Sequence, residues 1–397
     1  MRRFLLLAAV ALAAAACTER LTTPGNCPAL CPGGEPEVRD TVLTAVPGGD
    51  SSFSGYSSFT EASSFPLANG GALGESRAVI RFIQRGDSVI VGAESFELAI
   101  DSIIVRVVLQ ERDTTVGNLQ LAIYRLPGTI DSTLTWTELD ALMTEANRLR
   151  TISIPDSARS GPFPLLFTGA ELSKFDFAPA DSSRLAIGLR LIAPQPGVGA
   201  YFGASRSGDA APVFQTWGTI AVDDTAQQRQ LLQRAVAQNF PVRPAPTPVT
   251  DDLLMVGGDP ASRALIRFAL PDFLRDSATI LRATLELTPD RPIVGIPGDS
   301  TRLDVNALFA DFGAKSVPLN SPASLTWIKP GADTIRLEVT QLVRTWQGAT
   351  PLPAALRIRH GFEWSSFMTP IFRSTRSASG APRLRITYRP PFALEGF

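Results

Sequence analysis

The heptapeptide SRAVIRF, Ser76–Phe82, returns almost unchanged as SRALIRF, Ser262–Phe268. Three further pairs of segments accompany it in the two halves of the chain. They are LTW at 134–136 and 325–327, FTGAELSKF at 167–175 against VTQLVRTW at 339–346, and FGASRSGDAAP at 202–212 against FRSTRSASGAP at 372–382. Because four matched anchors recur in each half of the chain, the sequence predicts a duplicated domain.

Apolar and polar residues alternate with a period of two in both units. In the second heptapeptide, Ala264, Ile266 and Phe268 alternate with Arg263 and Arg267. The same pattern runs through ILRATLEL at 280–287, ALRIRH at 355–360, RLRITY at 383–388 and, in the first unit, RLAIGLRL at 184–191. This alternation is typical of half-buried antiparallel strands. With 31 Gly and 32 Pro for turns, it predicts an all-β fold of two tandem antiparallel β-sandwich domains, jelly-roll-like in form.

Two stretches have helical rather than strand-like spacing. Residues 137–149 place five apolar side chains on one helical face, which predicts a short helix in the first domain. Residues 223–240 do the same and precede the Pro-rich PVRPAPTP, so they predict a helical, Pro-rich connector. We therefore expect a first, more divergent domain at 40–222, a linker at 223–250, a second domain at 251–391 and a tail at 392–397.

The amino terminus reads MRRFLLLAAVALAAAAC, with two arginines before an uncharged apolar run that is too short to cross a bilayer. It predicts a signal peptide at 1–16 that ends in a lipobox-like AAAC, with lipidation of Cys17. An ordinary signal peptide cleaved after Ala16 is the alternative. Residues 17–39 then form a lipidated Cys and flexible tether, where Cys27 and Cys31 are candidates for a disulfide. Thr18, where Asp would favour the inner membrane, points to a lipid-anchored protein of the cell envelope, at the outer membrane.

The anchors of the second unit resemble the DNRLRE domain, the disaggregatase-related repeat of secreted surface proteins. The resemblance rests on LIRF at 265–268, ATLEL at 283–287, TW at 326–327, VTQLVRTW at 339–346 and PRLRITY at 382–388. The first unit resembles the family more weakly. The resemblance implies a β-sandwich module, carbohydrate binding as in some members, and core positions for Trp327 and Trp346.

No catalytic constellation is present in the sequence. The chain has one histidine, His360, which shares strand parity with Leu356 and Ile358 and is expected to pack at the end of its strand. The three GDS triplets read as turns, and we expect no enzyme and no cofactor. Asp251, Asp252 and Asp259 are weak candidates for a structural calcium site. With a net charge of -1 and no dense basic patch, nucleic acid is not an expected partner.

Arginines at the outward positions of the predicted strands are the candidate ligand-binding residues, together with Trp364 in a Gly/Ser loop. These arginines are Arg267, Arg282, Arg357, Arg359, Arg383 and Arg385. If their strands are neighbours, they form one Arg-lined sheet face able to bind carboxylates or sulfates. The predicted function is non-catalytic surface binding or scaffolding, with an anionic polysaccharide as the ligand. A structural envelope protein that binds other proteins is the alternative, and a polysaccharide lyase or hydrolase the third.

Overall fold

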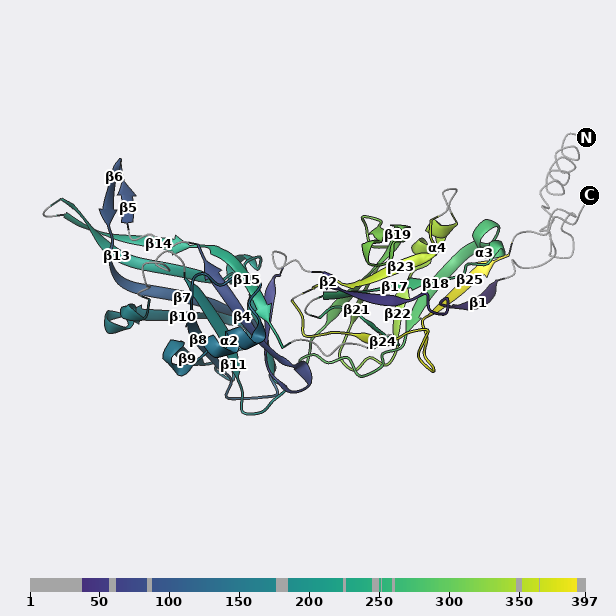
Figure 1. Cartoon of the computed structure of the whole chain (residues 1–397), viewed down its shortest axis with the longest axis horizontal. Helices are drawn as coiled ribbons and strands as arrows, with labels where there is room; N and C mark the ends of the chain where they lie inside the picture. Colours follow the sequence, from purple (N-terminus) through teal and green to yellow (C-terminus); the bar gives the residue numbers. More distant parts are fainter. Residues whose placement is uncertain are drawn as a thin grey trace, which may run out of the picture.

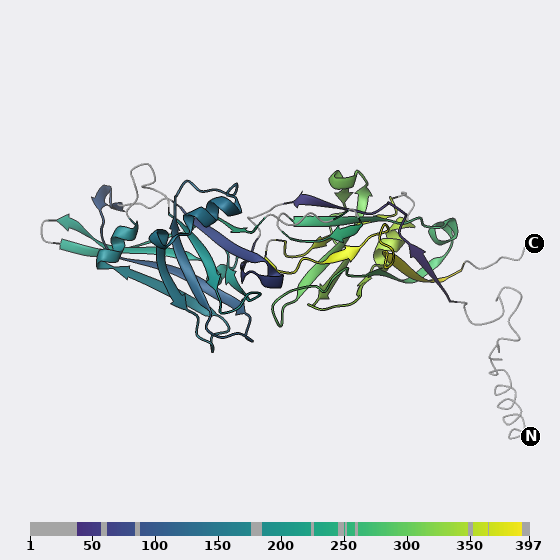
Figure 2. The ribbon, with the colours of Figure 1, turned by 60° about the horizontal axis from the view of Figure 1, so that its bottom comes forward.

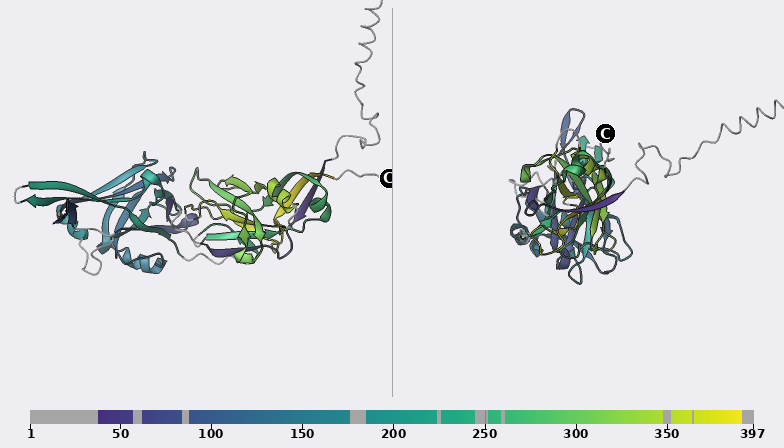
Figure 3. Two further views of the ribbon diagram at one scale, coloured as in Figure 1. Left: turned by 90° about the horizontal axis from the view of Figure 1, so that it is seen from above. Right: turned by 90° about the vertical axis from the view of Figure 1, so that its right-hand side faces the viewer.

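The computed structural model describes residues 38–56, 62–83, 88–175, 185–223, 226–244, 250, 252–258, 261–347, 352–363 and 365–390. They form two lobes that lie end to end along the long axis of the molecule (Figure 1, and from above in Figure 3). Both lobes are built from antiparallel sheets, which confirms the all-β sandwich prediction. The predicted signal peptide, Cys17, Cys27, Cys31 and the 392–397 tail lie outside the described residues.

One lobe combines the amino-terminal strands with the carboxy-terminal part of the chain; we call it the split domain. One of its sheets has the order β1-β25-β18-β22, and the other has the order β2-β17-β23-β19-β20, with β21 also paired to β19. Its strands are β1 Arg39–Thr44, β2 Ser51–Tyr56, β16 Leu253–Met255, β17 Ala261–Arg267, β18 Thr279–Leu287, β19 Thr301–Ala310, β20 Val317–Pro318, β21 Ser324–Ile328, β22 Ile335–Glu338, β23 Ala355–His360, β24 Ile371–Arg373 and β25 Arg383–Arg389; its helices are α3 Asp272–Asp276 and α4 Thr340–Trp346, with a 3₁₀ turn η7 Gly313–Lys315.

The other lobe, which we call the inserted domain, covers the described residues between 62 and 244. Its strands are β3 Ser64–Asn69, β4 Glu75–Phe82, β5 Ser88–Val91, β6 Glu94–Glu97, β7 Ala99–Arg112, β8 Gln120–Leu126, β9 Arg148–Ser153, β10 Gly161–Thr168, β11 Ala186–Ile192, β12 Gly199–Gly203, β13 Val213–Asp223, β14 Ala226–Arg234 and β15 Val236–Val242. Its helix is α2 Trp136–Leu142, and its 3₁₀ turns are η3 Gly71–Leu73, η4 Glu145–Asn147, η5 Gly169–Phe175 and η6 Gly208–Ala210.

The two domains share the pairing order of their main strands, although β12 and β3 join the two layers of the inserted domain into one 11-stranded sheet. In the inserted domain β14, β13, β7 and β10 pair in series, as β1, β25, β18 and β22 do in the split domain. On the second sheet β15-β4-β11-β8 corresponds to β2-β17-β23-β19. The repeated heptapeptides thus lie in the matching strands β4 and β17, as a duplicated domain requires.

The domain boundaries predicted from sequence need correction. β1 and β2, assigned to the first domain, complete the second: Thr41 lies opposite Ile386, and Phe53 lies opposite Arg263. Their purple ribbons lie among the green and yellow strands of the right-hand lobe (Figures 1 and 2). The inserted domain therefore interrupts the split domain between β2 and β16.

The helix predicted for the connector at 223–240 is wrong. This stretch forms β14 and β15, which close the two sheets of the inserted domain by pairing with β13 and β4. Pairing with distant strands determines its structure, and a local apolar spacing carries no information about such partners. The helix predicted at 137–149 is confirmed in its first half, as α2, whereas its end enters η4 and β9.

Each sandwich encloses its own apolar core. In the split domain the inward residues of β17, β18, β23 and β25 pack with Trp346 of α4, which is 2% exposed. The alternation expected in ILRATLEL holds for Ala283, Leu285 and Leu287, which are buried. Leu281 is 38% exposed instead, because the register with β25 shifts between Ile280 and Arg282.

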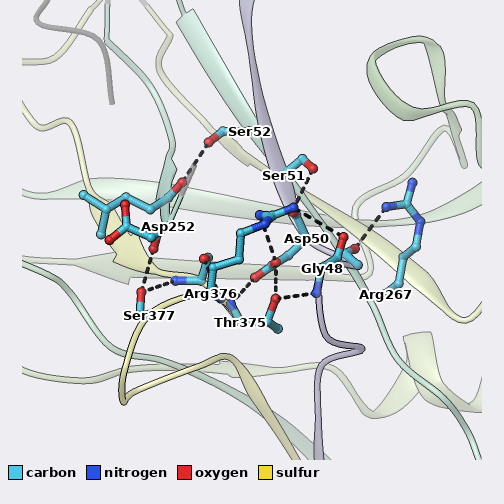
Figure 4. A network of polar contacts seen from close by, with 12 residues as sticks. Gly48, Asp50, Ser51, Ser52, Asp252, Arg267, Thr375, Arg376 and Ser377 are labelled. Atoms are coloured by element: carbon cyan, nitrogen blue, oxygen red, sulfur yellow. Dashed lines mark hydrogen bonds and ion pairs between the residues drawn. The ribbon is translucent and has the colours of Figure 1, made fainter. Parts of the chain in front are cut away.

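A polar network fastens the β1–β2 connection to the rest of the split domain (Figure 4). The Asp50 carboxylate is fully buried and accepts hydrogen bonds from the Thr375 backbone N–H and hydroxyl, at 2.7 and 2.5 Å. The Arg376 guanidinium lies 3.7 Å from it and also donates to the Asp50 carbonyl. Arg267 donates to the Gly49 carbonyl from the neighbouring strand. These contacts join segments more than 200 residues apart in the chain.

Candidate functional site

The outer face of the second sheet differs sharply between the two domains. In the inserted domain this face carries small and apolar residues such as Ala122, Ala186 and Tyr124, and Leu139 of α2 packs against them. A Thr135–Glu138 capping box starts this helix. The helix α2 therefore covers the centre of this face.

In the split domain the matching face carries an aromatic pair, of which Trp327 is exposed and Phe362 is half-buried. Trp327 on the edge strand β21 is 59% exposed and lies opposite Arg302 of β19. Its indole packs on the ring of Phe362, and the two ring centroids lie 5.6 Å apart. The Arg302 guanidinium lies 5.3 Å from the centroid of the Phe362 ring. We call Trp327, Phe362 and Arg302 the aromatic platform. A flat, exposed indole of this kind is a surface on which an apolar ligand face can stack.

Polar groups continue the face beside the platform. Asp304 is buried between two guanidinium groups, with Arg302 at 2.7 Å and Arg359 at 3.0 Å. Arg357 donates to the amide oxygen of Asn306 at 3.3 Å. By strand register, Asp304 and Arg357 occupy the places that Ala122 and Gly188 hold in the inserted domain. At these two positions the fold therefore presents hydrogen-bonding side chains in the split domain but not in the inserted domain.

A polar cleft of about 190 Å³ opens where the two domains meet. Its walls come from both domains and include Phe362 of the aromatic platform. The lining residues are Ser63, Ser64, Gln110, Glu111, Tyr201, Asp299, Ser300, Phe362, Ser365 and Ser366. The cleft is therefore continuous with the platform through the Phe362 side chain.

The domains are joined tightly behind this cleft. The Tyr201 hydroxyl of β12 donates to Asp299 of the split domain at 2.7 Å and accepts from the Phe367 backbone N–H at 3.2 Å. The Tyr201 and Phe367 rings pack 4.7 Å apart. A Cβ at Gly199 would lie 2.8 Å from Phe367 and 2.9 Å from Ile296, so only glycine fits there. The cleft is thus preformed by a packed joint.

Two carboxyl groups in the cleft have raised pKa values. Burial raises the pKa of Asp299, although hydrogen bonds from Tyr201 and two backbone N–H groups oppose the shift. Partial burial raises the pKa of Glu111, and the negative charge of Asp299 adds to it. Burial beside Asp299 also raises the pKa of the Tyr201 phenol, so this hydroxyl remains a donor. The cleft therefore holds two acidic groups, and its lining residues include no lysine or arginine.

His360 lies behind the platform with both ring nitrogens occupied. Its Nδ1 accepts from the Phe362 backbone N–H at 3.0 Å, so its Nε2 donates to the Thr301 hydroxyl at 2.6 Å. Burial lowers its pKa to about 4, helped by Arg243 and Arg302. The prediction of a packed histidine at a strand end is confirmed; its role is to hold Phe362 in place.

The six predicted arginines do not form one face. Arg267, Arg357 and Arg359 belong to the sheet that carries the platform, whereas Arg282, Arg383 and Arg385 belong to the other sheet. The alternation of residues along a strand shows which side chains point outward, but it does not show which of the two sheets contains the strand. The sequence pattern alone could therefore not group these arginines. Four of the six also bind carboxylates of the chain: Arg267 with Asp311, Arg282 with Glu338, Arg359 with Asp304 and Arg385 with Glu286.

The remaining predicted site residues divide as follows. Trp346 is buried, as the family resemblance implied, but Trp327 is exposed. Trp364, Asp251 and Asp259 lie outside the described residues. The Asp252 carboxylate accepts a hydrogen bond from the Thr250 hydroxyl. Within the described part of the chain, no group of three or more His, Cys, Asp or Glu side chains could hold a metal ion. No helix in that part is long and apolar enough to cross a membrane.

No protein family and no curated protein matches the chain. Among solved structures, a protein of Parabacteroides distasonis described as secreted aligns over 88% of this chain and 98% of its own, at 9% identity and a TM-score of 0.22. The N-terminal CBM22-1-CBM22-2 tandem domain of Paenibacillus barcinonensis Xyn10C aligns over 87% and 99%, at 9% identity and a TM-score of 0.16. Similarities this distant carry no argument about function. The functional argument therefore rests on the site itself.

Proposed function

We propose that this chain is a non-catalytic, lipid-anchored protein of the cell envelope, held at the outer membrane through Cys17, that binds polysaccharide on its split domain. The observation that carries the binding proposal is the contrast between the two copies of one fold. The sheet face that α2 and apolar residues close in the inserted domain is open in the split domain, where it carries an exposed Trp327 beside Asp304 and Arg359.

The chemistry of the face suits a sugar ring. The C–H groups of a pyranose stack on an indole such as Trp327, whose face carries partial negative charge. The hydroxyl groups around the ring can then bond to the half-buried guanidinium groups of Arg302 and Arg359, which Asp304 holds in place. A chain of sugars on this face reaches Phe362 and the mouth of the cleft. The resemblance to the DNRLRE domain, with its carbohydrate-binding members, is part of this proposal.

Retention on a polysaccharide panel tests the proposal. A form that begins at Thr18 is passed over immobilised neutral, uronic and sulfated polysaccharides, beside a Trp327→Ala variant. We expect the parent to be retained on at least one polysaccharide and the variant to bind about tenfold more weakly, a loss of about 1.4 kcal/mol. Trp217→Ala, in the inserted domain, is the matched control and should behave as the parent. Equal retention of all three forms would overturn the platform as the site, and shortening of the glycan would overturn the non-catalytic part.

An envelope protein partner is the second candidate. Phe309, Phe312 and Val317 are 62%, 70% and 47% exposed around the turn from β19 into β20. Exposed apolar side chains that gather in this way favour a protein contact. Crosslinking in the native envelope through a photoreactive residue at Phe312 tests it; a specific protein adduct is expected, and its absence would remove this candidate.

A further inference from the structure

We propose that the cleft between the two domains binds the ammonium group of an amino sugar, so that the favoured ligand is a glycan with free amines. This inference rests on the proposed function, because it extends the same glycan from the platform into the cleft. It reverses the charge preference that the outward arginines suggested.

The charges on the two surfaces support this choice. On the platform face, the guanidinium groups of Arg302 and Arg359 share the single buried Asp304, so this cluster keeps one net positive charge. In the cleft the situation is the opposite. The negative charge of Asp299 raises the pKa of Glu111, and the lining contains no lysine or arginine. A bound cation would relieve this repulsion.

The lining also fits an amino sugar better than a simple cation. Phe362 supplies an apolar wall that continues from Trp327, while serines 63, 64, 300, 365 and 366 offer hydroxyl groups. The Tyr201 hydroxyl already donates to Oδ2 of Asp299, so this carboxylate is held in one orientation toward the cleft. A hydroxylated ring with one ammonium group satisfies the apolar, neutral polar and anionic parts of this lining together.

Both domains contribute to the proposed subsite. Glu111 and Gln110 come from β7 of the inserted domain, whereas Asp299, Ser300 and Phe362 come from the split domain. The packed joint at Tyr201 and Phe367 fixes the distance between them. The duplication would thus serve binding, because neither domain forms this cleft alone.

Two matched ligands test the inference: the hexasaccharide of glucosamine and the hexasaccharide of N-acetylglucosamine, which differ only in the charge and acetylation of the amine. Calorimetric titration of the form that begins at Thr18 should show binding of the glucosamine hexamer about tenfold tighter. Glu111→Gln and Asp299→Asn should each remove most of this preference, measured as the ratio of the two affinities. Glu94→Gln, on the β5–β6 hairpin, makes the same charge change outside the cleft and should keep the preference.

The outcomes separate this inference from the proposed function. Equal affinity for the two hexamers, both lost in Trp327→Ala, would overturn the amine subsite and keep the platform. A preference for the amine that survives Glu111→Gln would place the ammonium group elsewhere and overturn the inference. If neither hexamer binds while another polysaccharide is retained, the amine subsite is wrong as well. If Asp299→Asn fails to fold, the exposed Glu111 variant alone decides the outcome.

Discussion

At the scale of single residues, the same letters take different roles in the two copies. The LTW triplet at 134–136 places Thr135 as the cap of α2, whereas at 325–327 it lies within the strand β21. The family resemblance implies a core position for Trp327, whereas the structure places it on the surface. The sequence shows which residues recur, but their exposure depends on whether an element such as α2 covers them. Tyr201, Asp299 and Glu111 gave no signal, because only the joint between domains brings them together.

Asp50 should be the polar residue on which the split domain depends most. An Asp50→Ala change leaves Thr375 and the Arg376 guanidinium without their buried partner. We expect the free energy of unfolding to fall by about 3 kcal/mol, as for other broken buried charge pairs. Urea titration measures this, with Asp276→Ala at the exposed end of α3 as the control. A loss no larger than in the control would contradict the role given to Asp50.

His360 should make stability depend on pH in the acidic range. Its pKa is about 4 in the folded chain, below its ordinary value of about 6.5 when unfolded. The folded state therefore binds fewer protons than the unfolded state between these two pKa values. The contribution of neutral His360 to the free energy of unfolding is complete above pH ~6.5 and is lost as the pH falls toward 4. The parent should lose up to about 3 kcal/mol more than His360→Gln over this window. Unfolding curves at pH 7 and 4.5 for both proteins measure the difference; parallel losses would show that His360 is not buried as a neutral ring.

At the scale of elements, the interior strands could be predicted and the edge strands could not. The strand β25 alternates throughout, and β17 and β23 alternate except at residues such as Leu265 and Ala355, which are buried on the outer face. β14 and β15 share the spacing of an amphipathic helix, with Leu232, Val236 and Phe240 on one face. Their strand form follows from the open edges of β13 and β4, which are known only once the sheets are assembled.

The amino-terminal strands should be required for the split domain and dispensable for the inserted one. A form that begins at Ala62 lacks β1 and β2, so the edges of β25 and β17 lose their partners. We expect calorimetry to show the unfolding transition of the inserted domain and loss of the other. Adding a peptide of residues 38–56 should restore the missing transition, and a form that begins at Val38 is the control. Two intact transitions without the peptide would contradict the split arrangement.

At the scale of the whole molecule, the two copies of the domain obtain their edge strands from different parts of the chain. The inserted domain takes its edge pair, β14 and β15, from its own carboxy-terminal end, whereas the split domain takes β1 and β2 from the amino-terminal part of the chain. The matched heptapeptides predict two similar domains, but the edge pairs share no recognisable sequence. Their placement fixes which end of the split domain lies near the chain's start: Arg39 pairs with Tyr388 at the end remote from the inserted domain (Figure 1). In the proposed lipoprotein, the anchored end therefore lies opposite the platform and cleft.

The most direct test is a crystal structure of the form that begins at Thr18 with the glucosamine hexasaccharide bound. The account predicts a sugar ring stacked on Trp327, the glycan passing Phe362, and an amine within hydrogen-bond distance of Asp299 or Glu111. A glycan bound to the other sheet, beside Arg282 and Arg385, or anywhere on the inserted domain alone would contradict it.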